Sequence, residues 1–280
     1  MDLIVDLKAR LHRVEFKPQA GAGEGVLLEF SDPAPCKAVS SSMAVETLAE
    51  GPCGASYDVL QVLSVAREGK DESRWRKDLR SLMDSTGTGR PVPIVTVKVE
   101  DVLVFWRPGW ATVQAPPQRM DVVLLALADF AYYEGQLRRI EDETAAAWAD
   151  AEADLPVAHD AASVGAARRV ELADHSAATF RRRMRHVRIE PHLYEPAAAM
   201  PPLAVQLGEA LREEAGIEDR LEYLDGKLEV FESIYEMVSQ RLADCTHNKQ
   251  GLGVEWLIVG LLAAELILTI AGFVAEHVAH

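Results

Sequence analysis

The 280-residue sequence has little cysteine, few aromatic residues and no excess of positive charge. Its three cysteines, Cys36, Cys53 and Cys245, are too few and too scattered for a disulfide framework or a cysteine-based zinc site. A formal net charge of -15 at pH 7 argues against a broad nucleic-acid surface, because phosphate binding requires positive potential. Hydrophobic residues at 49% and charged residues at 26% are ordinary for a folded protein, so extensive disorder is not expected.

Sequence motifs for catalysis and metal binding are also missing. The eight histidines show neither H-x-x-x-H nor H-E-x-x-H spacing, so no metal site is predicted. There is no G-x-x-x-x-G-K-S/T phosphate loop and no G-x-S-x-G nucleophile elbow. We therefore predict a protein that is not an enzyme, with no catalytic, cofactor-binding or metal-binding residues, no cofactor and no small-molecule substrate.

The residue pattern of the first 116 residues is typical of a small α+β domain. Runs rich in β-branched and aromatic residues, bounded by Gly and Pro clusters, lie at 26–30, 57–63 and 92–99. Val102–Trp106 and Trp110–Gln114 are separated by Arg-Pro-Gly, which predicts a strand, a tight turn and a second strand. Residues 74–83 predict a short helix. We expect an antiparallel sheet, with the domain ending at Pro116-Pro117.

The next part of the chain, 119–250, predicts an all-α helical bundle or coiled coil. Apolar residues recur at helical spacing over 119–150 and 160–188, and prolines 191, 196, 201 and 202 indicate a loop before the last helix, 202–248. That helix carries an apolar stripe in strict 4-3 spacing, the condition for a left-handed coiled-coil seam: Ile217, Leu221, Leu224, Leu228, Phe231, Tyr235, Val238, Leu242 and Cys245. The seam packs against a second subunit or against another helix of the same chain.

The longest apolar stretch covers 254–275. Its 22 residues suffice for a helix to cross a hydrocarbon core of about 30 Å at about 1.5 Å per residue. Glu265, near the midpoint, costs about 2.5 to 3.5 kcal/mol on insertion, and the 12 Leu, Ile, Val and Phe neighbours at roughly -0.3 to -0.6 kcal/mol each offset this cost. We therefore predict a C-terminal transmembrane helix, with a buried helix at the centre of an oligomer as the alternative.

An acidic side chain at that depth is expected to face another helix. Gly260 and Ala264 have a small-xxx-small spacing that allows close approach, and Thr269 continues the polar face of Glu265. The predicted homo-oligomer interface therefore combines this segment with the 4-3 seam: Glu255, Trp256, Gly260, Ala264, Glu265, Thr269, Leu221, Leu224, Leu228, Phe231, Tyr235, Val238 and Leu242.

The charges before the apolar stretch predict its orientation. Arg241 and Lys249 precede it, which by the positive-inside tendency leaves the bulk of the chain in the cytoplasm. Because the N-terminus lacks the pattern of a signal peptide, we expect a single-pass, tail-anchored protein of the bacterial inner membrane, with membrane lipid as a partner.

A cluster of arginines stands out in the helix predicted over 160–188. It consists of Arg181, Arg182, Arg183, Arg185 and Arg188. Three interpretations are open: pairing with acids of the long helix, such as Glu213, Glu214, Glu218 and Asp219; binding of anionic lipid headgroups; and binding of RNA or another acidic partner.

The C-terminal half resembles a known family. Asp219–Glu229 followed by Glu255-Trp256 and by Glu265 ten residues later looks like the signature of the required-for-meiotic-nuclear-division family, also called YagE-like. Val102–Trp106 is similar to a strand of the same family. The resemblance implies a non-catalytic, oligomeric protein anchored by its C-terminal helix. Mitochondrial members are linked to support of organellar translation, and this chain is more similar to bacterial members.

These patterns together predict a non-enzymatic, tail-anchored oligomeric scaffold or tether that supports translation or organises a membrane-bound assembly. Two alternatives stay open. One is an enzyme whose site is built from loops of the N-terminal α+β domain. The other is a ribosome- or RNA-associated factor that uses the cluster Arg181–Arg188.

Overall fold

The computed structural model describes residues 9–18, 25–43, 57–65, 77, 93–159, 164–196 and 199–278, without the side chains of 246–255 and 269–278. Cys53 and, apart from Lys77, the predicted helix over 74–83 lie outside the described residues. Two compact units divide the chain. Unit 1 comprises 1–146 and 181–228, and unit 2 comprises 147–180 and 229–280. Helices α5 and α7 each contribute to both units, which are described separately below.

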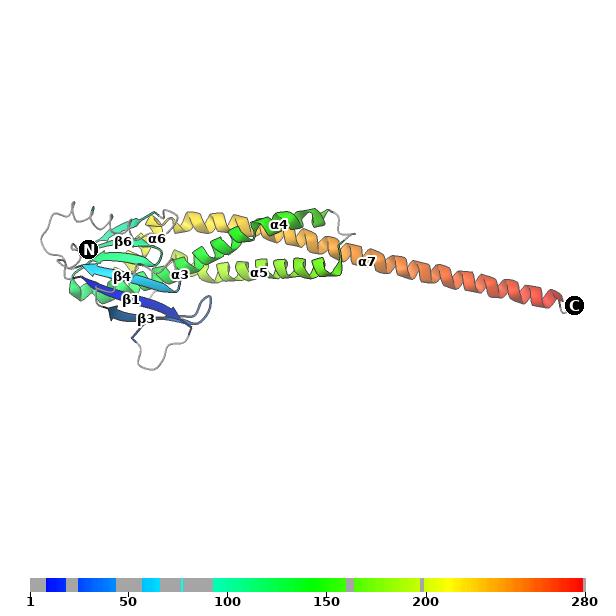
Figure 1. Ribbon diagram of the computed structural model, residues 1–280, viewed down its shortest axis with the longest axis horizontal. Helices are drawn as coiled ribbons and strands as arrows, with labels where there is room; N and C mark the ends of the chain where they lie inside the picture. The colour runs from blue at the N-terminus through cyan, green and yellow to red at the C-terminus, as the bar shows by residue number, and fades with distance from the viewer. Residues whose placement is uncertain are drawn as a thin grey trace. The chain divides into compact units, whose positions relative to one another are not determined.

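Unit 1 contains a mixed seven-stranded sheet in the order β2-β3-β1-β4-β7-β6-β5 (Figure 1). The strands are β1 Arg10–Lys17, β2 Val26–Phe30, β3 Cys36–Met43, β4 Val59–Val65, β5 Val95–Val99, β6 Val102–Arg107 and β7 Trp110–Gln114. All neighbouring pairs are antiparallel except β4 and β7, which run parallel from Gln61 opposite Trp110 to Val65 opposite Gln114. The α+β class is therefore confirmed, whereas the expected antiparallel sheet is mixed.

The hairpin of β6 and β7 forms where the sequence predicts it. Arg107 pairs with Trp110, so Pro108 and Gly109 form a two-residue turn. Gly109 has φ +76°, a left-handed conformation that glycine adopts without the steric cost of a Cβ. Five of the six β6 residues are buried, because apolar clusters cover both faces of this strand.

Helix α3, Met120–Ala146, follows the short helix η2, Pro117–Arg119, and packs against β2 and β4. The main core of unit 1 lies between this helix and one face of the sheet, and it includes Trp106, Phe130 and Leu127. Trp106 and Phe130 meet edge to face with ring centroids 4.8 Å apart, a favoured geometry for aromatic pairs. Helix α6, Pro202–Glu214, packs on both α3 and β5.

One helix was expected over 202–248, but two helices cover these residues. Helix α6 ends at Glu214 and α7, Ile217–Val278, begins after Ala215 and Gly216. Gly216 has φ +59°, and its N–H donates to the Glu213 carbonyl at 3.0 Å while the Ala215 N–H donates to Leu211. These contacts satisfy the last carbonyls of α6, as in a glycine-terminated helix end.

Helix α5 covers Ala166–Tyr194 and so includes Pro191, which was expected to lie in a loop. Proline removes only the bond to the carbonyl four residues earlier, that of Val187, whose side chain is exposed. The helix continues because the solvent can satisfy that carbonyl.

Unit 2 combines α4, Trp148–Asp154, and η3, Leu155–Ala158, with the first part of α5 and the later part of α7. Two small apolar clusters hold these segments together. Phe231 and Tyr235 of α7 pack on Ala151 of α4, and Val238 packs with Ala158 and Leu172. Trp148 adds an edge-to-face contact with Phe231 at 5.3 Å.

Candidate functional site

An ion pair is buried between α3 and α6 of unit 1. Arg212 Nη2 donates to Asp129 Oδ2 at 2.7 Å and to the His192 carbonyl at 2.9 Å, and both charged side chains are 5% exposed. Burial raises the pKa of Asp129, an effect that the Arg212 guanidinium and then His192 oppose. Within the described part of the chain, Arg212 Nε and Nη1 have no hydrogen-bond acceptor, and the guanidinium lies over the Phe130 ring.

This ion pair connects to a set of aromatic and polar side chains around His192. The imidazole of His192 stacks on the Tyr133 ring with centroids 4.6 Å apart. Its Nε2 lies 3.6 Å from Asp32 Oδ2, and Arg188 Nε donates to the other oxygen of Asp32 at 2.9 Å. Asp129 and Asp32 therefore have nearby cations, which compensate their charge inside the fold.

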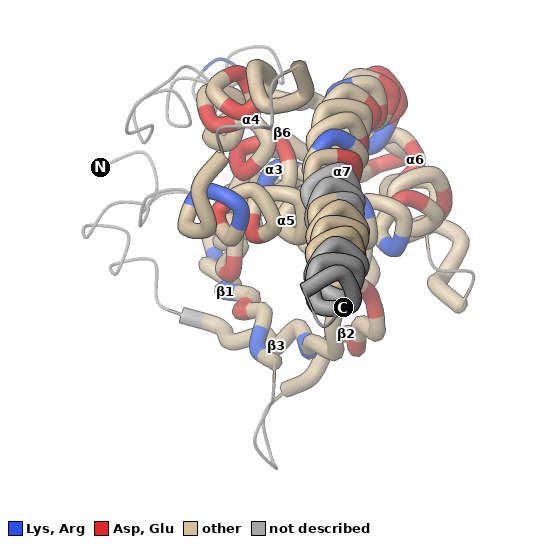
Figure 2. The backbone as a smooth tube through the Cα atoms, turned by 90° about the vertical axis from the view of Figure 1, so that its right-hand side faces the viewer, with Lys and Arg blue, Asp and Glu red and all other residues tan. Residues whose placement is uncertain are grey.

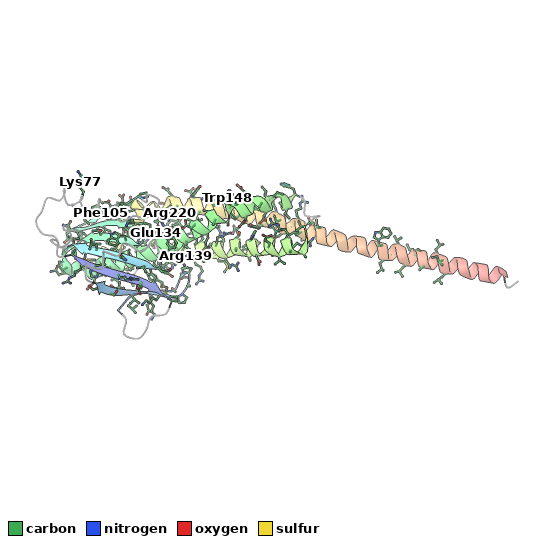
Figure 3. The ribbon with its side chains drawn as sticks, viewed as in Figure 1. Lys77, Phe105, Glu134, Arg139, Trp148 and Arg220 are labelled. Atoms are coloured by element: carbon green, nitrogen blue, oxygen red, sulfur yellow. The ribbon has the colours of Figure 1, made fainter. Side chains whose placement is uncertain are left out.

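A second charge cluster surrounds Glu134 on α3, whose side chain is 2% exposed (Figure 3). Its Oε1 accepts hydrogen bonds from Arg138 at 2.7 Å and from Arg220 Nη1 at 3.0 Å. Arg220, at the start of α7, also donates twice to the carboxylate of Glu141, at 2.9 and 2.8 Å. One arginine therefore joins two acids of α3, in the bidentate geometry that suits guanidinium and carboxylate groups.

A small recess lies beside Glu134, lined among others by Tyr57, Trp106 and Gly135. Its free space is about that of one water molecule, so it is far below the size of a pocket for an organic ligand. The Tyr57 hydroxyl donates to Asp142, and burial followed by this hydrogen bond raises the pKa of Tyr57 to about 12. Tyr57 is therefore a neutral hydrogen-bond donor at physiological pH.

Unit 2 contains a buried carboxylate of its own. Asp154 is fully buried, and its Oδ2 accepts hydrogen bonds from Tyr235 at 3.0 Å and from His175 Nδ1 at 2.8 Å. Arg168 donates to Oδ1 of the same carboxylate. Because both oxygens are bonded, Asp154 joins α4 to α5 and α7 within unit 2. Over the described ranges, no group of three or more His, Cys, Asp or Glu side chains is arranged to hold a metal ion.

Four members of the arginine cluster are bonded inside unit 1. Arg182 is 6% exposed and its Nη1 donates to the Glu143 carbonyl at 3.0 Å. Arg185 forms a bidentate pair with the Glu143 carboxylate. Arg183 pairs with Asp225, and Arg188 pairs with Asp32.

Pairing of the arginines inside the chain was one of the three interpretations, but the partners differ from those suggested by the sequence. Asp225 lies on the predicted long helix, although it is not one of the four acids named, whereas Glu143 and Asp32 lie outside that helix. The reason is that α3 and a loop before β3 also contribute acids, whereas the sequence suggested only the long helix. Arg181 is the fifth member, and its side chain is exposed.

The 4-3 seam of α7 is covered by the chain itself. Leu221, Leu224 and Leu228 are at most 2% exposed and belong to the core of unit 1. In unit 2, Phe231, Tyr235 and Val238 are at most 3% exposed, and Leu242 packs beside Val238. This packing favours the intramolecular alternative for the seam, because its apolar surface is already removed from water.

The predicted membrane anchor over 254–275 is wrong. In the part of the chain that is described, no helix is both long and apolar enough to span a membrane. The predicted orientation and inner-membrane localisation rested on this anchor and are withdrawn with it.

The same segment of α7 carries an exposed apolar surface. Nine large apolar side chains between Trp256 and Leu268 are 50% to 74% exposed. Gly260 and Ala264 lie among them, and a Cβ added at Gly260 would meet no atom within 4 Å. The side chains of Glu255 and Thr269, also assigned to the predicted oligomer interface, lie outside the described residues.

The sequence reasoning missed the buried charges. Asp129 and Glu134 interrupt the apolar run of α3, five residues apart, and Arg212 follows the buried Leu211 of α6. A charged residue on the apolar face of a predicted helix is a signal for a buried ion pair, since such residues are rarely buried without a partner. No family model and no curated protein matches the chain.

Proposed function

We propose that this protein is a non-catalytic scaffold that assembles into homo-oligomers through Trp256–Leu268 of α7, hereafter the apolar segment. The observation that carries the proposal is the exposure of nine large apolar side chains on this short stretch of helix. Contiguous apolar patches of more than a few hundred Å² are rare on monomers, and they mark interaction sites.

The direction of these side chains supports an assembly with several neighbours. Trp256, Leu257, Ile258 and Val259 follow one another at about 100° per residue, so the apolar side chains point to all sides of the helix. A single partner helix covers one stripe only. Burial of each large side chain contributes roughly 1.5 to 3 kcal/mol, so an arrangement that covers all sides is favoured.

Close approach of the helices is supported by Gly260 and Ala264, which leave room for a neighbouring backbone. Glu265 follows directly after Ala264. A carboxylate beside a helix contact is expected to adopt a hydrogen bond to the neighbouring subunit, because an unpaired buried charge is costly.

The family resemblance also belongs to this proposal. Glu255-Trp256 and Glu265 carry the resemblance to the required-for-meiotic-nuclear-division family, and they lie in or directly before the apolar segment. An oligomeric, non-catalytic role that supports translation agrees with that resemblance. The enzyme and RNA-binding alternatives have less support. The recess beside Glu134 is the size of one water, three of the five clustered arginines pair with acids, and Arg182 donates to a backbone carbonyl.

Light scattering of the full chain, with and without substitutions in the apolar segment, tests this proposal. We expect the full chain to exceed twice the single-chain mass of 30.7 kDa, and Leu261→Glu with Leu262→Glu to lower that mass. Val26→Glu is the matched control, because Val26 is also apolar and 40% exposed but lies on β2. Equal masses for the full chain and the double variant would contradict the proposal.

A further inference from the structure

Helix α5 exposes a second apolar stripe, distinct from the apolar segment of α7. Apolar residues alternate three and four positions apart along the helix, and all are exposed: Val170, Ala173, Ala177, Phe180, Met184, Val187, Pro191 and Tyr194. The large side chains among them are 51% to 64% exposed. This spacing is that of the seam of a left-handed coiled coil. We refer to these eight residues as the outer stripe of α5. Because they lie on one helix at this spacing, they share one face of it.

The opposite, buried face of α5 is apolar at Leu172, Ile189 and Leu193 but polar over its central part. Thr179, Arg182 and His186 are at most 6% exposed, and both ring nitrogens of His186 have no partner among the described residues. A helix that served only this chain's own core would turn its apolar face inward. Over 179–186, α5 does the reverse: its buried side chains are polar, and Phe180 and Met184 are not covered by the described part of the chain, which favours a partner for this face.

Helix α7 carries a sparser exposed row, with one large apolar residue in each heptad. Tyr223, Val230 and Met237 lie seven residues apart and are 69%, 46% and 44% exposed. They lie on the face opposite the buried seam of Leu221, Leu224 and Leu228. We refer to these three residues as the outer stripe of α7.

We infer that the outer stripe of α5 packs against the outer stripe of α7 in a second copy of this chain. Two identical copies related by a two-fold axis would form this contact twice, once through each α5. The contact involves the two outer stripes, within 170–194 of α5 and 223–237 of α7, and does not use the apolar segment.

Charge complementarity identifies the second copy's α7 as the partner. Helix α5 holds seven arginines and three acids, and the exposed Arg181 directly follows Phe180 of the stripe. Residues 217–245 of α7 hold eight acids and three basic residues. Figure 2 shows basic residues in blue and acidic residues in red along the two helices.

The acids on α7 are placed beside its stripe at the same interval. Glu222, Glu229 and Glu236 directly precede the three residues of the outer stripe of α7, so they form an acidic edge. Pairing of α5 with a second α5 would place arginines against arginines near its centre, which is unfavourable. Opposite edges therefore favour α5 against α7 over α5 against α5.

Photo-crosslinking in the full chain tests the inference. A benzophenone amino acid replaces Met184, and the protein is mixed with an isotope-labelled copy so that mass spectrometry separates links between copies from links within one. We expect links from position 184 to residues 223–237 of the other copy. The same probe at Val26, on β2, is expected to give none. Links only within one copy, or from α5 to α5 of the other copy, would overturn the inference.

Two further measurements keep this contact distinct from the proposed oligomerisation. The crosslink is expected to persist in the Leu261→Glu, Leu262→Glu variant, so failure of one contact does not imply failure of the other. Glu229→Arg is expected to lower the crosslink yield about twofold to fivefold, and Arg181→Glu in the same chain to restore it. Both substitutions are at exposed positions, and unchanged thermal unfolding verifies the fold. An unchanged yield in Glu229→Arg would contradict the pairing of the charged edges.

Discussion

The two ends of α7 relate polarity to burial in opposite ways. At its start, Leu221, Leu224 and Leu228 are buried in unit 1, and Arg220 beside them pairs with Glu134 and Glu141. In the apolar segment, Trp256–Leu268, the nine large apolar side chains are at least half exposed. The first part is covered by its own chain, whereas the apolar surface of the second part is not covered by any residue that the structure describes.

The difference shows that the amino-acid type of a residue does not by itself determine whether its side chain is buried or exposed. Unit 1 keeps Asp129 and Glu134 inside because each has an oppositely charged neighbour within hydrogen-bond distance. The apolar segment has none of the neighbours that a core provides. The contrast between these two regions can be measured by substitutions in each of them.

Removal of the buried cation in unit 1 is expected to have the largest effect. Arg212→Ala leaves Asp129 buried beside Phe130 without its main partner, so we expect the free energy of unfolding to fall by about 3 to 5 kcal/mol. Urea denaturation measures this loss. Arg139→Ala is the control, because its pair with Asp58 is more exposed and contributes at most about 1 kcal/mol.

The double variant Asp129→Leu, Arg212→Met sharpens the same comparison. Because it removes both charges together, no unpaired ion remains in the core, and we expect most of the lost stability to return. A double variant as unstable as Arg212→Ala would show that the geometry of this site, and not its charge, limits stability.

The same substitution at the two ends of α7 compares the regions directly. Leu224→Ala removes a side chain that is 1% exposed and is expected to cost about 2 to 5 kcal/mol at every protein concentration. Leu262→Ala acts on a side chain that is 60% exposed, so its effect is expected to shrink to about 0.5 kcal/mol or less on dilution, as oligomers dissociate. Denaturation at two concentrations measures both. A concentration-independent loss in Leu262→Ala would place that residue in a core of its own chain.

Acid is expected to weaken unit 1 through His186. Burial lowers the pKa of His186 below 6.5, Arg183 acts in the same direction, and Glu190 and Asp225 oppose it. Arg182, one turn earlier on the same face of α5, is a further cation. The unfolded chain therefore takes up a proton at this histidine as the pH falls below 6.5, while the folded chain does not.

The stability that His186 contributes is present above pH 6.5 and is lost as the pH falls toward the folded-state pKa, by at most about 1.4 kcal/mol per pH unit. In His186→Leu this loss should be absent. Unfolding free energies at pH 7.5 and 5.5 measure the difference. Parallel acid dependence in the two proteins would assign it to other groups.

Glycine-to-alanine substitutions at two positions near the start of α7 are expected to change the stability in opposite directions. Gly216→Ala places a Cβ at φ +59° and is expected to destabilise the chain by about 1 to 2 kcal/mol. Gly226→Ala, in the exposed interior of α7 with no atom near the added Cβ, is expected to stabilise it by about 0.5 to 1 kcal/mol. Thermal unfolding of both variants measures the difference in sign.

Much of the fold follows from local patterns in the sequence. The strands β2, β6 and β7 lie where β-branched and aromatic runs predict them, and the turn at Pro108-Gly109 follows from its residues. By contrast, β1 and β3 were missed. The alternation of apolar and charged residues in β1 is the pattern of a half-buried strand and could have predicted it, whereas the three consecutive serines of β3 are not typical of a strand.

Contacts distant in the sequence were harder to foresee. The parallel pairing of β4 with β7 joins strands separated by more than forty residues, and no local signal specifies it. The break between α6 and α7 at Ala215 and Gly216 was missed because apolar residues continue on both sides of it. The partners of the clustered arginines come from α3, α7 and the loop before β3, and only tertiary packing brings these together.

The sequence by itself determined the α+β class, the hairpin of β6 and β7 and the apolar stripe of α7, because turn residues and periodicity act over a few neighbouring positions. Only the tertiary structure decided which face of each helix is covered, since burial depends on neighbours that are remote in the chain. It therefore turned the 4-3 seam of α7 inward, paired Asp129 with Arg212, and left apolar stripes of α5 and α7 at the surface.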